Sequence, residues 1–353
     1  MQNIDLFCHE KFDKIGIVMK KVLVLGACGA MGVHLVPELI KDGWRVDAVD
    51  RETGEALENV NYTVANALND DWLFDFLEGS HYDAIVDFML YIGKDRFEKR
   101  YKKLLDSTAH YIFFSSYRFY GDCEHPVRET SPRILETVKD PEFLADCDIE
   151  YSLYKAQQED ILNSSGYKNY TILRPSMVYS TTRYQLVGLE GYTFLRRVAQ
   201  GKKVVLPEKA RKLHAALVWS GDVAKMISRL LLNNKAMGET FTICNGEENH
   251  WEEIAELYKS LVGLDYEFID TEEYLSIFKN NINEYRKHIY DRFYDRTMDP
   301  TKILTVTGIK KEDLTPLRDG LKKELAALPK DYLWWENDIE TAMDNFIKEK
   351  YDI

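Results

Sequence analysis

The sequence predicts an α/β protein with a doubly wound parallel sheet and a smaller C-terminal domain. Short apolar runs alternate with helical patterns over the first half of the chain. The runs are apolar at successive positions, which is typical of strands buried on both faces of a parallel sheet. A glycine-rich loop follows the first run and leads into a helix. This alternation predicts parallel strands joined by right-handed helical crossovers.

The first strand is predicted over residues 22–25, and the helix that follows it ends at Gly43. Further strands are predicted over residues 45–50, 62–65, 83–88, 110–114 and 170–173. The intervening helices are predicted over residues 71–78, 95–107 and 151–163. The second half is less regular, with helices over residues 192–200, 222–233 and 251–261 and short strands near Val204, Ala216 and Phe241.

The chain is predicted to contain four regions. Residues 1–18 mix charges with short apolar pieces and lack a signal-peptide core, so we expect an extension without a role in the fold. Residues 19–175 form the sheet domain. Residues 176–330 form mainly the smaller domain, which would bind the substrate, with segments that return to the sheet domain. Residues 331–353 are aromatic and charged, a pattern typical of an amphipathic helical tail.

The charge balance bears on the class of partner. The 353 residues include 46 Lys and Arg and 59 Asp and Glu, a net charge of −13. A surplus of acid disfavours nucleic acid as the main partner, because phosphate backbones bind basic surfaces. The histidines show no His-x-x-x-His spacing, so no metal site is expected.

The cysteines and the hydropathy pattern bear on location. None of the five cysteines belongs to a Cys-x-x-Cys pair, and their odd number disfavours a disulfide framework, which fits a reducing cytoplasm. No apolar run approaches the ~20 residues needed to cross a bilayer. We therefore expect a cytoplasmic protein without a membrane partner.

The loop after the first strand reads Gly26-Ala27-Cys28-Gly29-Ala30-Met31-Gly32. Glycines let the backbone turn sharply and approach a pyrophosphate, and the amides and dipole at a helix N-terminus then hold the anion. Between a buried strand and a helix, the pattern predicts a dinucleotide-binding (Rossmann) domain. The predicted cofactor contacts in this loop are Gly26, Gly29, Ala30, Met31 and Gly32.

Three residues beyond the loop are candidates for binding the adenosine half of the cofactor. Asp50 ends the second strand, where a carboxylate accepts hydrogen bonds from both ribose hydroxyls. Arg51 could attract a 2′-phosphate, but the neighbouring acid would repel it, so NAD is favoured over NADP. Asn66 follows the third strand and could either touch the adenine edge or cap the strand.

Tyr151 and Lys155 are the candidate catalytic pair. Their four-residue spacing at the start of a predicted helix stacks both side chains on one face. The lysine would lower the pKa of the phenol and also reach the nicotinamide ribose. The phenolate could then act as a base at a substrate hydroxyl, or the phenol as an acid at a carbonyl. Ser116, at the end of the fifth strand, could hydrogen-bond the same oxygen or cap the strand.

Taken together, these residues resemble the extended short-chain dehydrogenases/reductases, and more narrowly the NAD-dependent nucleotide-sugar epimerase/dehydratase family. The resemblance covers roughly residues 20–245. It rests on the glycine loop, Asp50, Ser116 with Tyr120-Gly121, the Tyr151 and Lys155 pair, Leu173-Arg174-Pro175, Val178-Tyr179 and Gly221-Asp222-Val223-Ala224. It implies a Rossmann fold, NAD, a nucleotide sugar as substrate, and a homodimer through the helices that hold residues 94–103 and Tyr151.

The sequence departs from that family in three places. The bulky run Phe88-Met89-Leu90 would alter the wall near the nicotinamide. The 4,6-dehydratases carry Thr-Asp-Glu where this chain has Ser116-Tyr117-Arg118, which disfavours dehydration. Ala215 stands where relatives often carry an arginine that contacts the diphosphate. The candidates to replace that arginine in substrate binding are Arg211, Lys212 or His214, or Arg292 and Arg296.

Three hypotheses about function follow. The first is an NAD-dependent epimerase of a nucleotide sugar: Tyr151 removes a hydroxyl proton while hydride moves to NAD, and the transient keto intermediate is re-reduced on its other face. The second is a one-way NAD(P)-dependent reductase or dehydrogenase of a sugar or small carbonyl compound. The third is a non-catalytic relative that binds a cofactor or RNA. The net charge and the set Ser116, Tyr151 and Lys155 count against the third.

Overall fold

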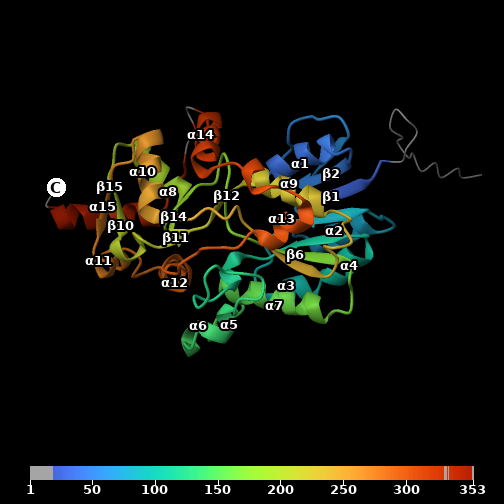
Figure 1. The fold of residues 1–353 in the computed structure, drawn as a ribbon, viewed down its shortest axis with the longest axis horizontal. Helices are drawn as coiled ribbons and strands as arrows, with labels where there is room; N and C mark the ends of the chain where they lie inside the picture. Colours follow the sequence, from blue (N-terminus) through green and yellow to red (C-terminus); the bar gives the residue numbers. More distant parts are fainter. Residues whose placement is uncertain (1–18, 330–331, 333, 352–353) are drawn as a thin grey trace, which may run out of the picture.

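A seven-stranded sheet forms the centre of one half of the molecule, on the right in Figure 1. The computed structural model describes residues 19–329, 332 and 334–351, so the predicted extension over residues 1–18 lies outside the described residues. The strands are β1 (Lys21–Leu25), β2 (Arg45–Asp50), β3 (Val60–Val64), β4 (Ala84–Asp87), β5 (Tyr111–Phe114), β6 (Tyr170–Pro175) and β13 (Glu239–Ile243). Their order is β13-β6-β5-β4-β1-β2-β3, and neighbouring strands run parallel.

Helices cover both faces of this sheet because its strands are apolar on both faces. Val22 and Val24 of β1 pack into one core, whereas Leu23 and Leu25 pack into the other. The first face carries α1 (Gly32–Lys41), α9 (Ser220–Leu230) and α13 (Thr301–Thr307). The second carries α2 (Asp70–Leu77), α3 (Lys94–Glu98), α4 (Tyr101–Asp106) and α7 (Tyr151–Ser164). The predicted doubly wound parallel sheet is confirmed.

The other half, on the left in Figure 1, contains short strand pairs and helices around a second core. The parallel pairs are β7 (Met177–Tyr179) with β12 (Leu217–Trp219), and β10 (Val204–Pro207) with β15 (Tyr266–Ile269). The antiparallel pairs are β8 (Gln185–Leu186) with β9 (Leu189–Glu190), and β11 (His214–Ala215) with β14 (Asn249–His250). The helices are α8 (Gly191–Ala199), α10 (Trp251–Val262), α11 (Thr271–Ser276), α12 (Ile282–Lys287), α14 (Leu317–Ala327) and α15 (Asp338–Tyr351).

Segments from the second half of the chain return to the sheet. Strand β13 adds to its edge beside β6, α9 packs on α1, and α13 packs on α9. The bounds of the four predicted regions themselves stay predictions. Two short helices, α5 (Ile134–Thr137) and α6 (Pro141–Ala145), pack on the outer side of α7, where Ile134 and Phe143 contact Leu153.

One helix differs from the sequence prediction. The helix predicted over residues 95–107 is divided into α3 and α4 by a turn at Lys99 and Arg100. The Arg100 side chain is fully buried, and its guanidinium donates hydrogen bonds to the carbonyl oxygens of Ala67 and Leu68 and pairs with Asp70. Because these acceptors lie on another segment, periodicity along the helix did not reveal the break.

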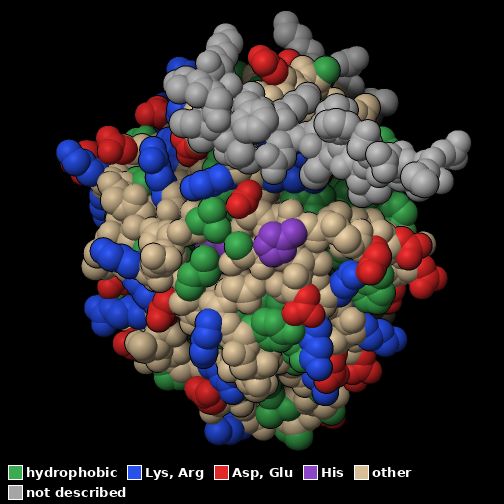
Figure 2. All heavy atoms as spheres, turned by 90° about the vertical axis from the view of Figure 1, so that its right-hand side faces the viewer, with side chains coloured by type: hydrophobic (Ala, Val, Ile, Leu, Met, Phe, Trp, Pro, Cys, Tyr) green, Lys and Arg blue, Asp and Glu red, His purple; other side chains and the backbone are tan. Residues whose placement is uncertain are grey.

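The described part of the chain contains no helix that is both long and apolar enough to cross a membrane. On the face in Figure 2, Lys and Arg side chains are interspersed with Asp and Glu. The described residues on that face therefore do not form one continuous basic surface.

Candidate active site

The glycine loop lies at the carboxyl end of β1 and leads into α1. Gly26 has a φ of +85°, a left-handed conformation that favours glycine. A Cβ at Gly32 would collide with the carbonyl oxygens of Ala27 and Gly26. Glycine is thus required at Gly26 by the turn and at Gly32 by the close approach of the helix to the loop.

A cavity of about 570 Å³ opens beside this loop. The predicted cofactor contacts that line it are Gly26, Gly29, Ala30, Met31, Asp50, Arg51 and Asn66, whereas Gly32 is not among its lining residues. The Asp50 carboxylate accepts hydrogen bonds from the backbone amides of Cys28 (2.8 Å) and Arg51 (2.7 Å). The bond from Cys28 holds the loop against the end of β2. A glycine turn at a helix N-terminus, with an acid beside it in a cavity of this size, fits a dinucleotide.

A second cavity of about 440 Å³ adjoins the first. Ser116, Tyr151 and Lys155 all line it. The sequence analysis predicted that these three residues act together, which requires that they reach one cavity. The two cavities share five lining residues: Met31, Phe88, Met89, Leu90 and Arg183. The cofactor cavity therefore leads directly to the predicted catalytic residues.

Lys155 is held in place by burial and by one strong hydrogen bond. Its ammonium donates to the carbonyl oxygen of Phe114 at 2.7 Å, and the residue is only 2% exposed. Burial lowers the pKa of Lys155 to about 8, an effect that the nearby Asp87 and Glu159 oppose. Asp87 is itself buried, which raises the pKa of its carboxyl although the hydroxyls of Tyr91 and Tyr111 donate to it.

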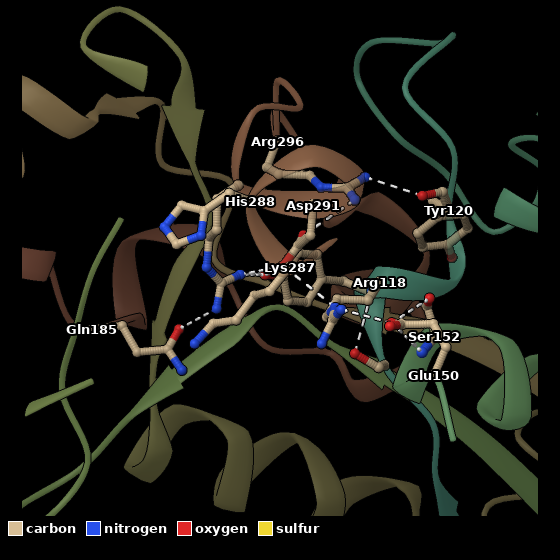
Figure 3. A network of polar contacts seen from close by, with 12 residues as sticks. Arg118, Tyr120, Glu150, Ser152, Gln185, Lys287, His288, Asp291 and Arg296 are labelled. Carbon is tan, nitrogen blue, oxygen red and sulfur yellow. Dashed lines mark hydrogen bonds and ion pairs between the residues drawn. The ribbon is translucent and has the colours of Figure 1, made fainter. Parts of the chain in front are cut away.

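Ser116 and Tyr151 come from two segments that a third residue, Arg118, joins. The Ser116 hydroxyl accepts a hydrogen bond from the Arg118 backbone amide at 3.2 Å. The Arg118 guanidinium lies 5.2 Å from the centre of the Tyr151 ring and pairs with Glu150 at 3.0 Å. Glu150 also caps α7 by accepting from the Ser152 amide. The start of α7 is thereby fixed against the end of β5 (Figure 3).

Asp291 is the centre of the polar network in Figure 3. It is fully buried and pairs with Arg292, with Arg296 at 3.2 Å and with Arg118 at 3.5 Å. Burial alone would raise the pKa of Asp291, but the three guanidinium groups hold it below its ordinary value. Tyr117 donates its hydroxyl proton to Asp291 at 2.9 Å.

The five residues predicted as candidates for substrate binding lie in different places, and one of them, Lys212, pairs with Glu252 outside the two cavities. Arg292 lines the second cavity, and Arg296 lies behind it, donating to the carbonyl oxygens of Tyr120 and Gly121. Arg211 is ion-paired with Glu208 and Glu252, and the His214 ring is hydrogen-bonded to Asp295 at 2.9 Å. Neither Arg211 nor His214 is among the residues that line the two cavities. Their roles in substrate binding stay predictions.

Sequence reasoning did not select Arg118, Arg183, Gln185, Glu190 or Lys287, which line the second cavity. The signal for Arg118 was its position two residues after Ser116. The others follow no local motif. Lys287 and Arg292 both reach the cavity because residues His288–Arg292 form a π-helical turn, in which side chains five apart share a face. On an α-helix these two residues would point about 140° apart.

The fold and the adjoining cavities define an α/β enzyme of the dinucleotide-binding class. The chain belongs to the NAD dependent epimerase/dehydratase family, whose model matches residues 22–244. The resemblance predicted from the sequence is confirmed. NAD is the cofactor of this family, and the loop, the acid and the cavity described above fit it.

Solved structures share this fold. The epimerase Mth375 from Methanothermobacter thermautotrophicus is 14% identical with a TM-score of 0.66, and the match covers 88% of this chain and 93% of that one. WbmH from Bordetella bronchiseptica, in complex with NAD⁺, is 17% identical with a TM-score of 0.63, and the match covers 89% of this chain and 100% of that one. UDP-glucose 4-epimerase from Thermus thermophilus, in complex with NAD, is 18% identical with a TM-score of 0.60, and the match covers 86% of this chain and 96% of that one. No curated protein matches the sequence.

Proposed function

We propose that this protein is an NAD-dependent epimerase of a nucleotide sugar, with Tyr151 as its acid and base. The observation that carries the proposal is that Ser116, Tyr151 and Lys155 line one cavity that opens into the cofactor cavity. Solved relatives with this fold include enzymes described as UDP-glucose 4-epimerases, which supports a nucleotide sugar as the substrate class.

The residues divide the chemistry among them. NAD, when bound, supplies the acceptor and donor of hydride. Tyr151 takes the proton of the substrate hydroxyl as the carbon is oxidised and returns it to the carbonyl oxygen when the opposite face is reduced. Ser116 hydrogen-bonds the same oxygen. Lys155 fixes the cofactor ribose through its ammonium group.

The second cavity holds both the sugar and the nicotinamide, and its wall is shaped by bulky side chains. Phe88, Met89 and Leu90 line both cavities, and Phe88 packs on Phe114 with ring centres 4.6 Å apart. A Cβ at Gly26 would lie 3.2 Å from that of Phe88, so the wall fits closely against the glycine loop.

The variant Tyr151→Phe tests this proposal. We expect it to lose epimerisation by about 10²- to 10⁴-fold, the range typical of a lost general acid or base, while NAD stays bound. Turnover of the wild type should be redox-neutral, with no net change in reduced-nicotinamide absorbance. Tyr154→Phe is the matched control, because Tyr154 does not line the cavity. Full activity of Tyr151→Phe, or net production of reduced cofactor, would contradict the proposal.

A homodimer through α3, α4 and α7 and a cytoplasmic location belong to the same proposal. Light scattering that gives the mass of two chains would support the homodimer. Disruption of the dimer by a charge reversal at Lys99 of the intervening turn, which is exposed in the single chain, would support the interface.

A further inference from the structure

The catalytic cavity concentrates positive charge in an acidic protein. Although the chain carries a net charge of −13, the cavity is lined by five cations and two carboxylates. The cations are Arg118, Lys155, Arg183, Lys287 and Arg292, and the carboxylates are Glu190 and Glu284. A local surplus of positive charge in a protein of negative net charge indicates a site for an anion.

The surplus is not spread evenly over the cavity. The positive charge of Lys287 is balanced by ion pairs with Glu284 at 3.1 Å and Glu190 at 3.4 Å. Lys155 is committed to the carbonyl oxygen of Phe114 and lies near the buried Asp87. Three cations of the wall remain: Arg183, which forms no ion pair with the described residues and also lines the cofactor cavity, and Arg118 and Arg292.

The cluster around Asp291 contains three guanidinium groups and, with Glu150, two carboxylates. Arg118, Arg292 and Arg296 share Asp291, and Arg118 also pairs with Glu150. Arg292 is 5% exposed and Arg296 is 2% exposed, so little solvent screens the remaining positive charge. The Nε atom of Arg292 is buried and has no hydrogen-bond partner among the described residues. An incompletely compensated buried charge is costly unless a ligand completes the set.

The place of this charge identifies the part of the substrate that it would meet. Arg118 follows Ser116 by two residues, and its guanidinium lies over the Tyr151 ring at 5.2 Å. An anion held by Arg118 would therefore lie close to Tyr151. The cluster around Asp291 has a surplus of one positive charge, which a singly charged carboxylate balances, and planar guanidinium groups bind carboxylates well.

We infer that the substrate is a sugar acid whose carboxylate lies next to the reacting carbon and binds between Arg118 and Arg292. This inference rests on the proposed function, and it adds that the cavity selects an acidic sugar over its neutral counterpart. Glu150 and Asp291 hold the two arginines in position, and the carboxylate completes their charge balance.

The test compares UDP-glucuronate with UDP-glucose, which differ only in a carboxylate against a hydroxymethyl group. Calorimetry on the NAD-loaded protein should give a tighter Kd for the acid by about ten- to a hundredfold, the value of one or two charge-assisted hydrogen bonds. The ratio of the two Kd values should fall to near one in the double variant Arg118→Gln/Glu150→Gln, which removes both partners of an ion pair. It should also fall to near one in Arg292→Gln. Arg133→Gln, an ion-paired arginine outside the cavity, is the matched control and should keep the wild-type ratio.

The outcomes separate this inference from the proposed function. Equal affinities in the wild type, or a preference that survives in both cavity variants, would overturn it. Tighter binding of inorganic phosphate than of free glucuronate would also overturn it. Selective binding of the acid without epimerisation of either sugar would contradict the proposed function and leave the anion site standing. Epimerisation of both sugars at equal kcat/KM would support the proposed function and overturn the inference of an acidic sugar.

Discussion

Burial of Lys155 gives the catalytic cavity its own dependence on pH. Burial lowers the pKa of Lys155 from the ordinary 10.5 to about 8. In the proposed mechanism Lys155 holds the cofactor ribose, and a neutral lysine donates a weaker hydrogen bond than an ammonium, so we expect kcat/KM to fall as the pH rises through about 8. A pH–rate profile between pH 6 and 10 checks this, and a profile that stays flat to pH 10 would contradict it.

The stability of the fold should change in the opposite direction over the same range. The unfolded chain keeps the Lys155 proton up to about pH 10.5, whereas the folded chain releases it near pH 8. Between these values the unfolded state binds more protons, so this residue makes the free energy of unfolding rise with pH. Urea unfolding at pH 8 and pH 10 measures that contribution, and Lys155→Met, which cannot titrate, should lack it. A loss of activity above pH 8 would thus not be caused by unfolding through this group.

Local sequence carried much information at the scale of single residues. The glycines of the loop and Asp50 stand where a strand and a helix meet, so that their conformations follow from their neighbours in the chain. The spacing of Tyr151 and Lys155 is one turn of a helix, and both side chains reach one cavity. Arg211 and His214 show the limit of such reasoning, since their contacts with Glu252 and Asp295 depend on distant segments.

At the scale of elements, a short hairpin and a distorted helix build the far wall of the catalytic cavity. The β8–β9 hairpin carries Gln185 and Glu190, and Gly188 at its tip lies so close to the His288 ring that a Cβ there would collide with it. His288 belongs to the π-helical turn that presents Lys287 and Arg292. The hairpin and the turn therefore fix one another, although about 100 residues separate them.

Helix α14 is tied to the cofactor half through Glu324. Its carboxylate accepts from the Trp219 indole at 2.6 Å and from Thr181 and pairs with His34 of α1 at 3.3 Å. Burial alone would raise the pKa of Glu324, but these partners hold it at about 2. The stabilisation is therefore present above pH 4.5, the ordinary value, and is lost as the pH falls from there toward 2.

We expect Glu324→Gln to lower the free energy of unfolding by about 1–3 kcal/mol at pH 7, because a buried network of charge-assisted hydrogen bonds loses its charge. Urea unfolding measures the change, and the difference from the wild type should shrink below pH 4.5. Glu312→Gln, at an exposed position, is the control and should leave stability unchanged. Equal stability of Glu324→Gln and the wild type at pH 7 would contradict the prediction.

At the scale of the whole molecule, the C-terminal helix α15 closes the half opposite the sheet (Figure 1). Asp344 pairs with the buried Arg197 of α8 and with Lys202, both at 2.6 Å, and Arg196 pairs with Glu340 at 3.4 Å. The helix predicted for the tail thus packs through its charged residues as well as through Met343, which is fully buried.

We expect Asp344→Ala to lower the free energy of unfolding by about 1–3 kcal/mol, because the buried Arg197 guanidinium loses its charged partner. NAD affinity should not change, since Asp344 does not line the cofactor cavity. Thermal unfolding with and without NAD measures both quantities. Glu349→Ala, at an exposed position of the same helix, serves as the control, and an equal loss of stability in that variant would argue against a specific role for the Asp344 pair.

Local patterns were enough to predict the doubly wound sheet, its first six strands in order, the glycine loop with its cofactor, and the family. These properties depend on periodicity and on turns between neighbouring elements, and both are local in the chain. The addition of β13 to the sheet and the division of a helix at Arg100 depend instead on contacts between distant segments. It also brought Arg118, Glu190, Lys287 and Arg292 together around the catalytic cavity. Such contacts join residues up to about 170 positions apart, and their geometry depends on how the two halves pack, which no local pattern encodes.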